Sequence, residues 1–144
     1  MRQLAFALIS VVFTASGQLD PAILSSQTLA GLKWNNNGRV QQIVLYGDPA
    51  REGLYVAVLK WPPGTGTRPH THPNDRFVTV LSGTWWVGTG TDYDMNKTVP
   101  MKTGSFIKHS AGGIHFDGAK DEEVIIEVVG MGPGTTTNVG ASKQ

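Results

Sequence analysis

Four histidines offer this chain its clearest chemistry, and all of them lie between positions 70 and 115. His70 and His72 are separated by one residue, so on a β-strand their side chains point to the same face. Neutral imidazoles bind divalent transition metals well, and three of them around one ion leave positions open for water, dioxygen or substrate. Without a metal, the same residues would be a group of hydrogen-bonded histidines.

The histidines are spaced against glycines in two stretches, GTGTRPHTHPNDRFVTVLSG and GSFIKHSAGGIHF. This arrangement resembles the two signature motifs of the cupin superfamily, a Gly, His-x-His, Glu, Gly motif and a Gly, Pro-x-Gly, His, Asn motif. The gap between the two stretches is also of cupin length. The matching residues are Gly64, His70, His72, Gly83, Gly104, Gly112 and His115.

The resemblance implies an all-β fold, the antiparallel double-stranded β-helix or jelly-roll barrel, over residues 38–130. It also implies that His70, His72 and His115 are the ligands of a divalent transition metal: iron, manganese, nickel, copper or zinc. Because cupins include dioxygenases, isomerases, decarboxylases, storage proteins and sensors, the fold leaves the reaction open.

The clearest departure from the family pattern is Arg76, which stands where cupins usually place a glutamate ligand. A guanidinium four residues after His72 points to the same interior if the strand is regular, and it would repel a metal ion. Arg76 must therefore swing to the barrel mouth or share an anion with the metal, unless the metal is absent. We predict the shared anion, which makes Arg76 a catalytic or binding residue. The neighbouring Asp75 could replace the glutamate only if a β-bulge reset the register.

Two positions of the second motif also depart from the pattern, Ser110 for proline and Ala119 for asparagine, but neither is a ligand position. His109 matches no ligand position either. It precedes the expected turn, so it is interpreted as a turn or rim histidine that would line the pocket only if its side chain faced inward.

Elements with strand character must position these residues. Short segments rich in Val, Ile, Trp, Tyr and Thr are separated by Gly, Pro and Ser turns, which is typical of an antiparallel sandwich or barrel. Residues 20–31 are expected to form one short helix or turn, and the run Val124-Ile125-Ile126 indicates a strand covered on both faces. The expected strands are Val40–Tyr46, Leu54–Trp61, Phe77–Leu81, Thr84–Val87, Ser105–Lys108, Ile114–Phe116 and Glu123–Val129.

Trp85 and Trp86 are adjacent, so one must face inward and the other outward. An outward tryptophan at the edge of a sheet would suit a contact between two copies of the chain, and many cupins are dimers. We therefore expect a homodimer.

The N-terminus has the three parts of a secretory signal: Arg2, an uncharged run over 4–13, and small residues at Ala15 and Gly17. The run is too short for a bilayer span, although it could also be a buried strand or helix. We predict cleavage after Gly17 and a periplasmic or secreted product. The expected organisation is a signal peptide at 1–17, an extension at 18–37, the cupin domain at 38–130 and a flexible tail at 131–144.

The amino-acid composition limits the classes of partner that we expect. The formal net charge is +1 over 144 residues, and without Arg2 the charges balance, so neither nucleic acid nor an anionic membrane is an expected partner once the signal is removed. The chain has no cysteine, which excludes disulfides and thiolate metal sites. The expected partner is a small molecule.

Two functions fit these expectations. The first is a metal-dependent oxidoreductase of the dioxygenase kind acting on a small oxygen-bearing molecule, with a three-histidine centre as in some cupin dioxygenases. The second is a non-enzymatic module that binds an anion or a sugar, with Arg76 supplying the positive charge.

Overall fold

A computed structural model describes residue 17 and residues 19–139 of the chain. The predicted signal lies outside the described residues except for Gly17, as do the last five residues of the predicted tail. Two units are distinguished, Met1–Leu32 and Lys33–Gln144. In the first unit, the expected short helix is a 3-10 turn, η1 (Leu29–Gly31), and the side chain of Thr28 caps it by accepting a hydrogen bond from the Gly31 amide.

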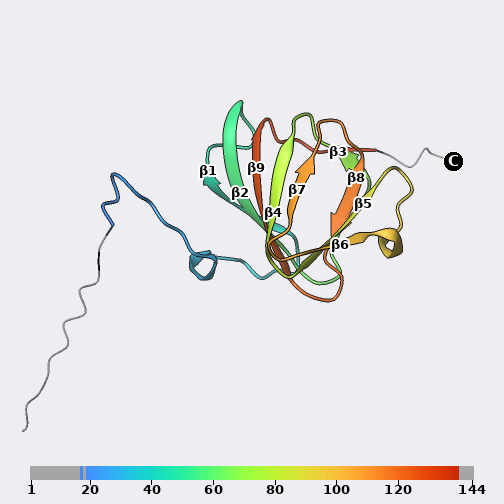
Figure 1. Ribbon diagram of the computed structural model, residues 1–144, viewed down its shortest axis with the longest axis horizontal. Helices are drawn as coiled ribbons and strands as arrows, with labels where there is room; N and C mark the ends of the chain where they lie inside the picture. Colours follow the sequence, from blue (N-terminus) through green and yellow to red (C-terminus); the bar gives the residue numbers. More distant parts are fainter. Residues whose placement is uncertain (1–16, 18, 140–144) are drawn as a thin grey trace, which may run out of the picture. The chain divides into compact units, whose positions relative to one another are not determined.

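The second unit is built from antiparallel strands in two five-stranded sheets, as the all-β prediction required (Figure 1). The first sheet has the order β1 (Gln41–Tyr46), β2 (Gly53–Trp61), β9 (Val124–Gly132), β4 (Arg76–Ser82) and β7 (Phe106–His109). The second has the order β10 (Thr137–Asn138), β3 (His70–Thr71), β8 (His115–Gly118), β5 (Thr84–Thr89) and β6 (Val99–Lys102). A 3-10 turn, η2 (Met95–Lys97), precedes β6.

Seven of the described strands begin within one residue of the start that the sequence predicted. The other three, β3, β6 and β10, were not predicted. Their sequences explain why, because β3 and β10 are two residues long and β6 contains Pro100. The described part of the predicted flexible tail contains strand residues. There β9 continues to Gly132, and β10 pairs Thr137 with Thr71 of β3.

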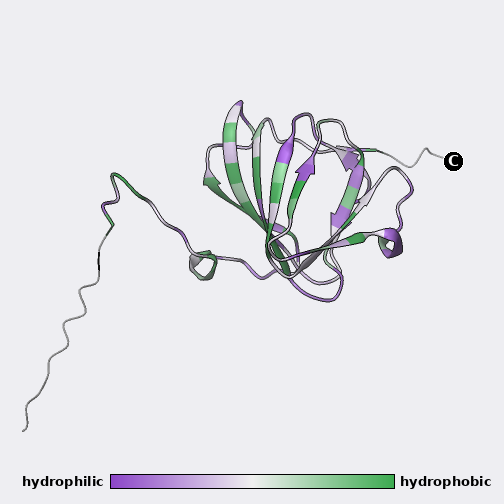
Figure 2. Ribbon diagram, viewed as in Figure 1, coloured by the Kyte–Doolittle hydropathy of each residue, from purple (hydrophilic) through white to green (hydrophobic). Residues whose placement is uncertain are grey.

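The hydrophobic core lies between the two sheets and follows the two-residue period of the strands. On β9, Val124, Ile126 and Val128 are buried, whereas Ile125 is only half-buried. From Val124 to Val129 both faces of this strand are covered, one of them more completely than the other. Figure 2 shows the resulting mixture of hydrophobic and hydrophilic bands along the strands.

The two adjacent tryptophans of β5 face opposite sides of the second sheet, as predicted. Trp85 is buried in the core, and Trp86 lies under the ammonium group of Lys120, with 3.6 Å between Nζ and the ring centroid. Because β6 covers the edge beside β5, Trp86 does not lie on an edge strand, contrary to the sequence interpretation.

Glycine permits the tight turn that returns the chain from β4 to β5. Gly83 has a φ of +76°, and a Cβ there would lie 2.4 Å from the carbonyl oxygen of Glu123. A larger residue would be strained and would also clash with the backbone. The closing glycine of the first motif is thus explained by geometry.

No helix in the described part of the chain is long and apolar enough to span a membrane.

Candidate metal centre

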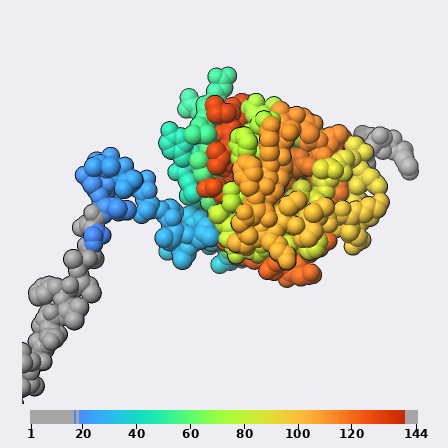
Figure 3. Space-filling view, viewed as in Figure 1, coloured from blue at the N-terminus to red at the C-terminus, as the bar shows by residue number. Residues whose placement is uncertain are grey.

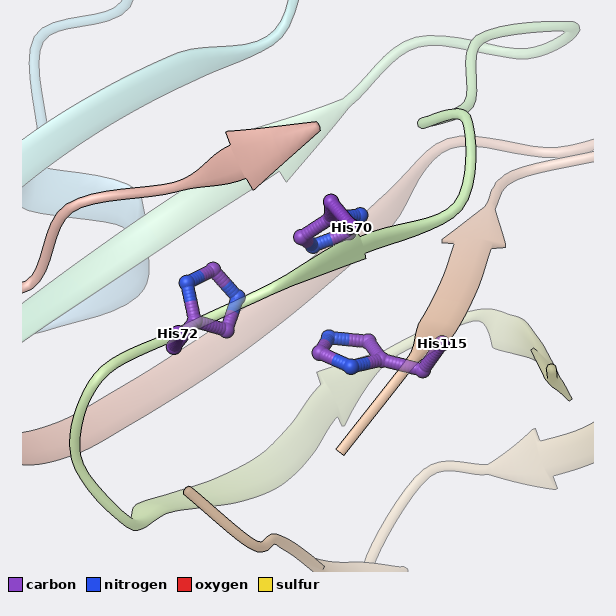
Figure 4. Close-up of side chains that lie close together, drawn as sticks. All are labelled: His70, His72 and His115. Atoms are coloured by element: carbon purple, nitrogen blue, oxygen red, sulfur yellow. The ribbon is translucent and has the colours of Figure 1, made fainter. Parts of the chain in front are cut away.

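His70, His72 and His115 converge in the interior from β3, the residues just after it, and the neighbouring strand β8 (Figure 4). His70 pairs directly with His115 in the β3–β8 register. The ring centroids are 4.8 Å apart for His70 and His72, 4.3 Å for His70 and His115, and 5.2 Å for His72 and His115. All three side chains are buried, and one ring nitrogen from each lies within 4.8 Å of the other two.

Backbone carbonyls determine the tautomer of each of these histidines. Nδ1 lies 2.8 Å from the Arg68 oxygen in His70, 2.9 Å from the Thr135 oxygen in His72, and 3.0 Å from the Gly113 oxygen in His115. A carbonyl only accepts, so each Nδ1 carries the proton and donates it. Each Nε2 therefore keeps a lone pair, which is the arrangement typical of metal-ligating histidines.

Burial keeps the rings of His72 and His115 uncharged. Desolvation, with the nearby positive charge of Arg76 as the next cause, lowers the pKa of His72 to about 4. Desolvation is also the main reason that the pKa of His115 is lowered to about 4. Both rings are neutral at neutral pH, which is the form that binds a metal.

Arg76 points into the same interior, as its position four residues after His72 predicted. Its Nη1 lies 3.0 Å from Nδ1 and 2.9 Å from Nε2 of His72. A donor that lay in the plane of the ring could form a hydrogen bond with one of these nitrogens but not with both. The guanidinium therefore lies over the face of the His72 ring. Burial lowers the pKa of Arg76, yet a guanidinium remains protonated.

Asp75 does not supply the missing carboxylate. It is exposed, its Oδ2 lies 2.7 Å from Nζ of Lys108, and its Oδ1 accepts a 2.8 Å hydrogen bond from the Ala111 amide. These bonds lower the pKa of Asp75. No β-bulge turns the side chain of Asp75 inward. Its odd spacing from His72 therefore keeps it from joining the histidines, as the sequence predicted.

His109 is not a rim residue, and this sequence interpretation is wrong. It is the last residue of β7, it pairs with Arg76 of β4, and only 7% of it is exposed. Its ring centroid is 3.9 Å from that of His115. Neither of its ring nitrogens has a hydrogen-bond partner, and desolvation, followed by the effect of His115, lowers its pKa to about 3.

Asp117 is a functional candidate that the sequence interpretation missed. It follows His115 by two residues on β8, so both side chains face inward. Its Oδ1 accepts a 2.9 Å hydrogen bond from the Thr67 hydroxyl, and its Oδ2 lies 3.8 Å from Nε2 of His115. Desolvation raises the pKa of this fully buried carboxyl. The pattern His115-x-Asp117 was the signal that could have identified it.

Solved structures with the same architecture decide the fold family. A cupin-like protein from Thermotoga maritima superposes with a TM-score of 0.60 at 20% identity, over 75% of this chain and 81% of that one. The polyketide cyclase RemF from Streptomyces resistomycificus superposes with a TM-score of 0.65 at 18% identity, over 83% and 88% of the two chains. This chain has the cupin fold.

A third structural neighbour of this cupin barrel is the DMSP lyase DddQ from Ruegeria pomeroyi, with a TM-score of 0.61 at 18% identity. That match covers 85% of this chain and 64% of the lyase. No protein-family model matches the sequence, and no curated protein matches it.

Two cavities flank the histidines of the cupin barrel. One, of about 430 Å³, is lined by His109, His115 and mainly apolar side chains such as Met101 and Ile107. The other, of about 260 Å³, is lined by a mixture of polar, aromatic and aliphatic residues, and its polar members include His70, His72, Arg76, Thr67 and Asp117. The cluster is therefore accessible from an apolar side and from a cationic side.

The residues present fit a divalent transition metal. His70, His72 and His115 supply three lone pairs within reach of one ion, and Nε2 of His115 is buried without a hydrogen-bond partner. A buried lone pair without a partner is uncommon, and metal ligation would satisfy it. Nitrogen ligands of this kind suit zinc, copper, iron and nickel and do not select among them.

Proposed function

We propose that the protein is a metal-dependent enzyme of the dioxygenase kind, in which His70, His72 and His115 hold a divalent metal and a small oxygen-bearing molecule is the substrate. One observation carries the proposal: three buried imidazoles lie with one ring nitrogen of each within 4.8 Å of the others, and the Nδ1 of each ring is held by a backbone carbonyl. When bound, the metal would supply a Lewis acid or redox centre at its open positions.

Arg76 would bind an anionic oxygen of the substrate. Its Nη1 lies against His72 and its Nε is buried without a partner, so part of the guanidinium has hydrogen-bonding capacity left. A carboxylate or enolate suits a guanidinium, which donates two parallel hydrogen bonds. Such an anion would also offset the repulsion between Arg76 and a bound cation.

The neighbours support a small-molecule substrate, because a polyketide cyclase and a DMSP lyase share this fold. They do not indicate a particular reaction. The proposed activity is tested by loading the purified protein with iron, manganese, nickel, copper or zinc and measuring metal content, dioxygen consumption and product formation with small carboxylates and enols. Turnover that disappears in His70→Ala and His72→Ala supports the proposal, and a protein that retains no metal would refute it.

A non-enzymatic binding module is the second candidate, and Arg76 is the observation that favours it. Arg76 lines the smaller cavity beside Thr67 and Thr136, which offers a cation and hydroxyl groups to an anion or a sugar. Calorimetry separates the two functions. Tight binding of a small carboxylate without any turnover in the metal-loaded protein would favour the module.

We further propose export and a homodimer. The export signal rests on Arg2 and the uncharged run after it, and the mass of the natively produced protein tests it, since a mature chain should begin at Gln18. The dimer contact would use the outer face of the first sheet, where Leu54, Phe77, Phe106 and Met131 are exposed. In Figure 3 the strands of this sheet lie side by side on the visible side of the molecule. Light scattering of the parent and of Phe106→Asp tests this contact.

A further inference from the structure

We propose that His109, His115 and Asp117 form a second metal position in the same interior, which Mn²⁺ occupies, whereas Zn²⁺ occupies the three-histidine position. The inference rests on the proposed function in one respect, namely that the protein binds a divalent metal. It concerns a different set of ligands and a different preference among metals.

The three side chains bring their donor atoms together from two sheets. One atom from each lies within 4.8 Å of the other two. His115 and Asp117 are two residues apart on β8, with 3.8 Å between Nε2 and Oδ2, and His109 reaches them from β7 of the opposite sheet. All three are more than nine-tenths buried.

The unsatisfied nitrogens point independently to a ligand. Neither nitrogen of the His109 ring has a hydrogen-bond partner, and Nε2 of His115 has none. A neutral imidazole has one donor and one lone pair, and buried polar atoms almost always find partners. One ion between the two rings would satisfy both lone pairs.

The two positions differ in charge. In the three-histidine set no ligand is anionic, and Nη1 of Arg76 lies 2.9 Å from Nε2 of His72, the atom that would bind the ion. The second set includes a carboxyl group, that of Asp117, and His72 is not one of its three donors. A metal-bound carboxylate offsets part of the charge of the ion, and this matters most for cations that bind nitrogen weakly.

Ligand chemistry then assigns the metals. Carboxylate oxygens suit Mn²⁺, whereas imidazole nitrogens suit Zn²⁺, and two histidines with one carboxylate leave several positions open in an octahedral ion. Three neutral histidines and no carboxylate favour the metal that binds nitrogen more strongly. Because both sets need the single free nitrogen of His115, they are alternative positions for one ion, and the two metals should compete.

The experiment is a calorimetric titration of the metal-free full chain with Mn²⁺ or Zn²⁺ alone, using matched amide variants of the two sets. Asp117→Asn and His109→Gln should each weaken Mn²⁺ binding at least tenfold and change Zn²⁺ binding less than threefold. His70→Gln and His72→Gln should do the reverse. His115→Gln should weaken both, and Zn²⁺ should displace Mn²⁺ from the parent with one ion bound per chain.

The outcomes distinguish this inference from the proposed function. Mn²⁺ binding that survives Asp117→Asn and His109→Gln, or that depends equally on His70 and His72, overturns the second position and leaves the three-histidine site intact. Zn²⁺ binding that survives His70→Gln and His72→Gln refutes the three-histidine site and leaves the second position intact. Circular dichroism checks folding, and His109→Gln still decides the question if Asp117→Asn fails to fold.

Discussion

The interior of the barrel has two sides that treat their polar residues differently. On the side of β3 and β8, His70, His72 and His115 each donate Nδ1–H to a backbone carbonyl. On the side of β4 and β7, Nε of Arg76 and both ring nitrogens of His109 have no partner. The first side is preorganised before any ligand arrives, whereas the second has hydrogen-bonding capacity that only a ligand can use.

Removal of His115 should have the largest effect, because it is the one residue that belongs to both donor sets. His115→Ala should lower the affinity for both Zn²⁺ and Mn²⁺ by more than about 100-fold, since loss of a ligand costs more than the 10–100-fold loss seen for its supporting partners. His115 is not one of the apolar residues that form the core, so the variant should fold. Metal titrations with circular dichroism measure this, and a loss confined to one metal would contradict a shared ligand.

Acid should destabilise the metal-free protein, because burial opposes protonation of three of its histidines. Desolvation lowers the pKa of His72, His109 and His115 to about 4, 3 and 4, so below pH 6.5 the unfolded chain binds protons that the folded chain does not. The free energy of unfolding is therefore highest above pH 6.5 and falls toward pH 4, by up to about 1.4 kcal/mol per pH unit for each histidine.

Urea unfolding between pH 7 and pH 4 measures this slope. His109→Leu should reduce the slope of unfolding free energy against pH by the contribution of about one histidine. A variant with the parental slope would show that His109 does not remain neutral in the folded protein.

The carbonyl of Thr135 should matter because it holds His72 in place. A chain ending at Gly132 loses this hydrogen bond and the pairing of β10 with β3, so its Zn²⁺ affinity should fall about 10–100-fold. A chain ending at Val139 keeps both features and serves as the control. Equal Zn²⁺ affinity in the two truncated chains would show that the tautomer of His72 does not need this carbonyl.

Substitution of Arg76 should have the smallest effect on metal binding and the clearest effect on anions. Arg76→Ala should leave Zn²⁺ affinity unchanged or raise it up to about tenfold, because the repulsion is removed, and it should abolish binding of small carboxylates. Arg76→Glu should tighten Zn²⁺ binding further by supplying a fourth ligand, and Arg76→Lys is the control that keeps the charge without the paired donors. Parental carboxylate binding in Arg76→Ala would make Arg76 a structural residue.

Much of the fold and part of the site could be predicted from short-range patterns. The two-residue period placed His70 and His72 on one face, the inward direction of Arg76 followed from the same rule, and the turn glycine Gly83 needs its positive φ. These properties depend on neighbours along the chain. They are the same in any antiparallel arrangement that the sequence adopts.

Tertiary structure alone decided which distant residues meet. The register of β4 against β7 brings His109 beside Arg76, and the short pairing of β10 with β3 lies next to the Thr135 carbonyl that orients His72. Asp117 is a buried carboxyl whose hydrogen-bond partner, Thr67, lies 50 residues away in the sequence. Register and burial depend on packing between segments far apart in sequence, and a local pattern does not contain that information.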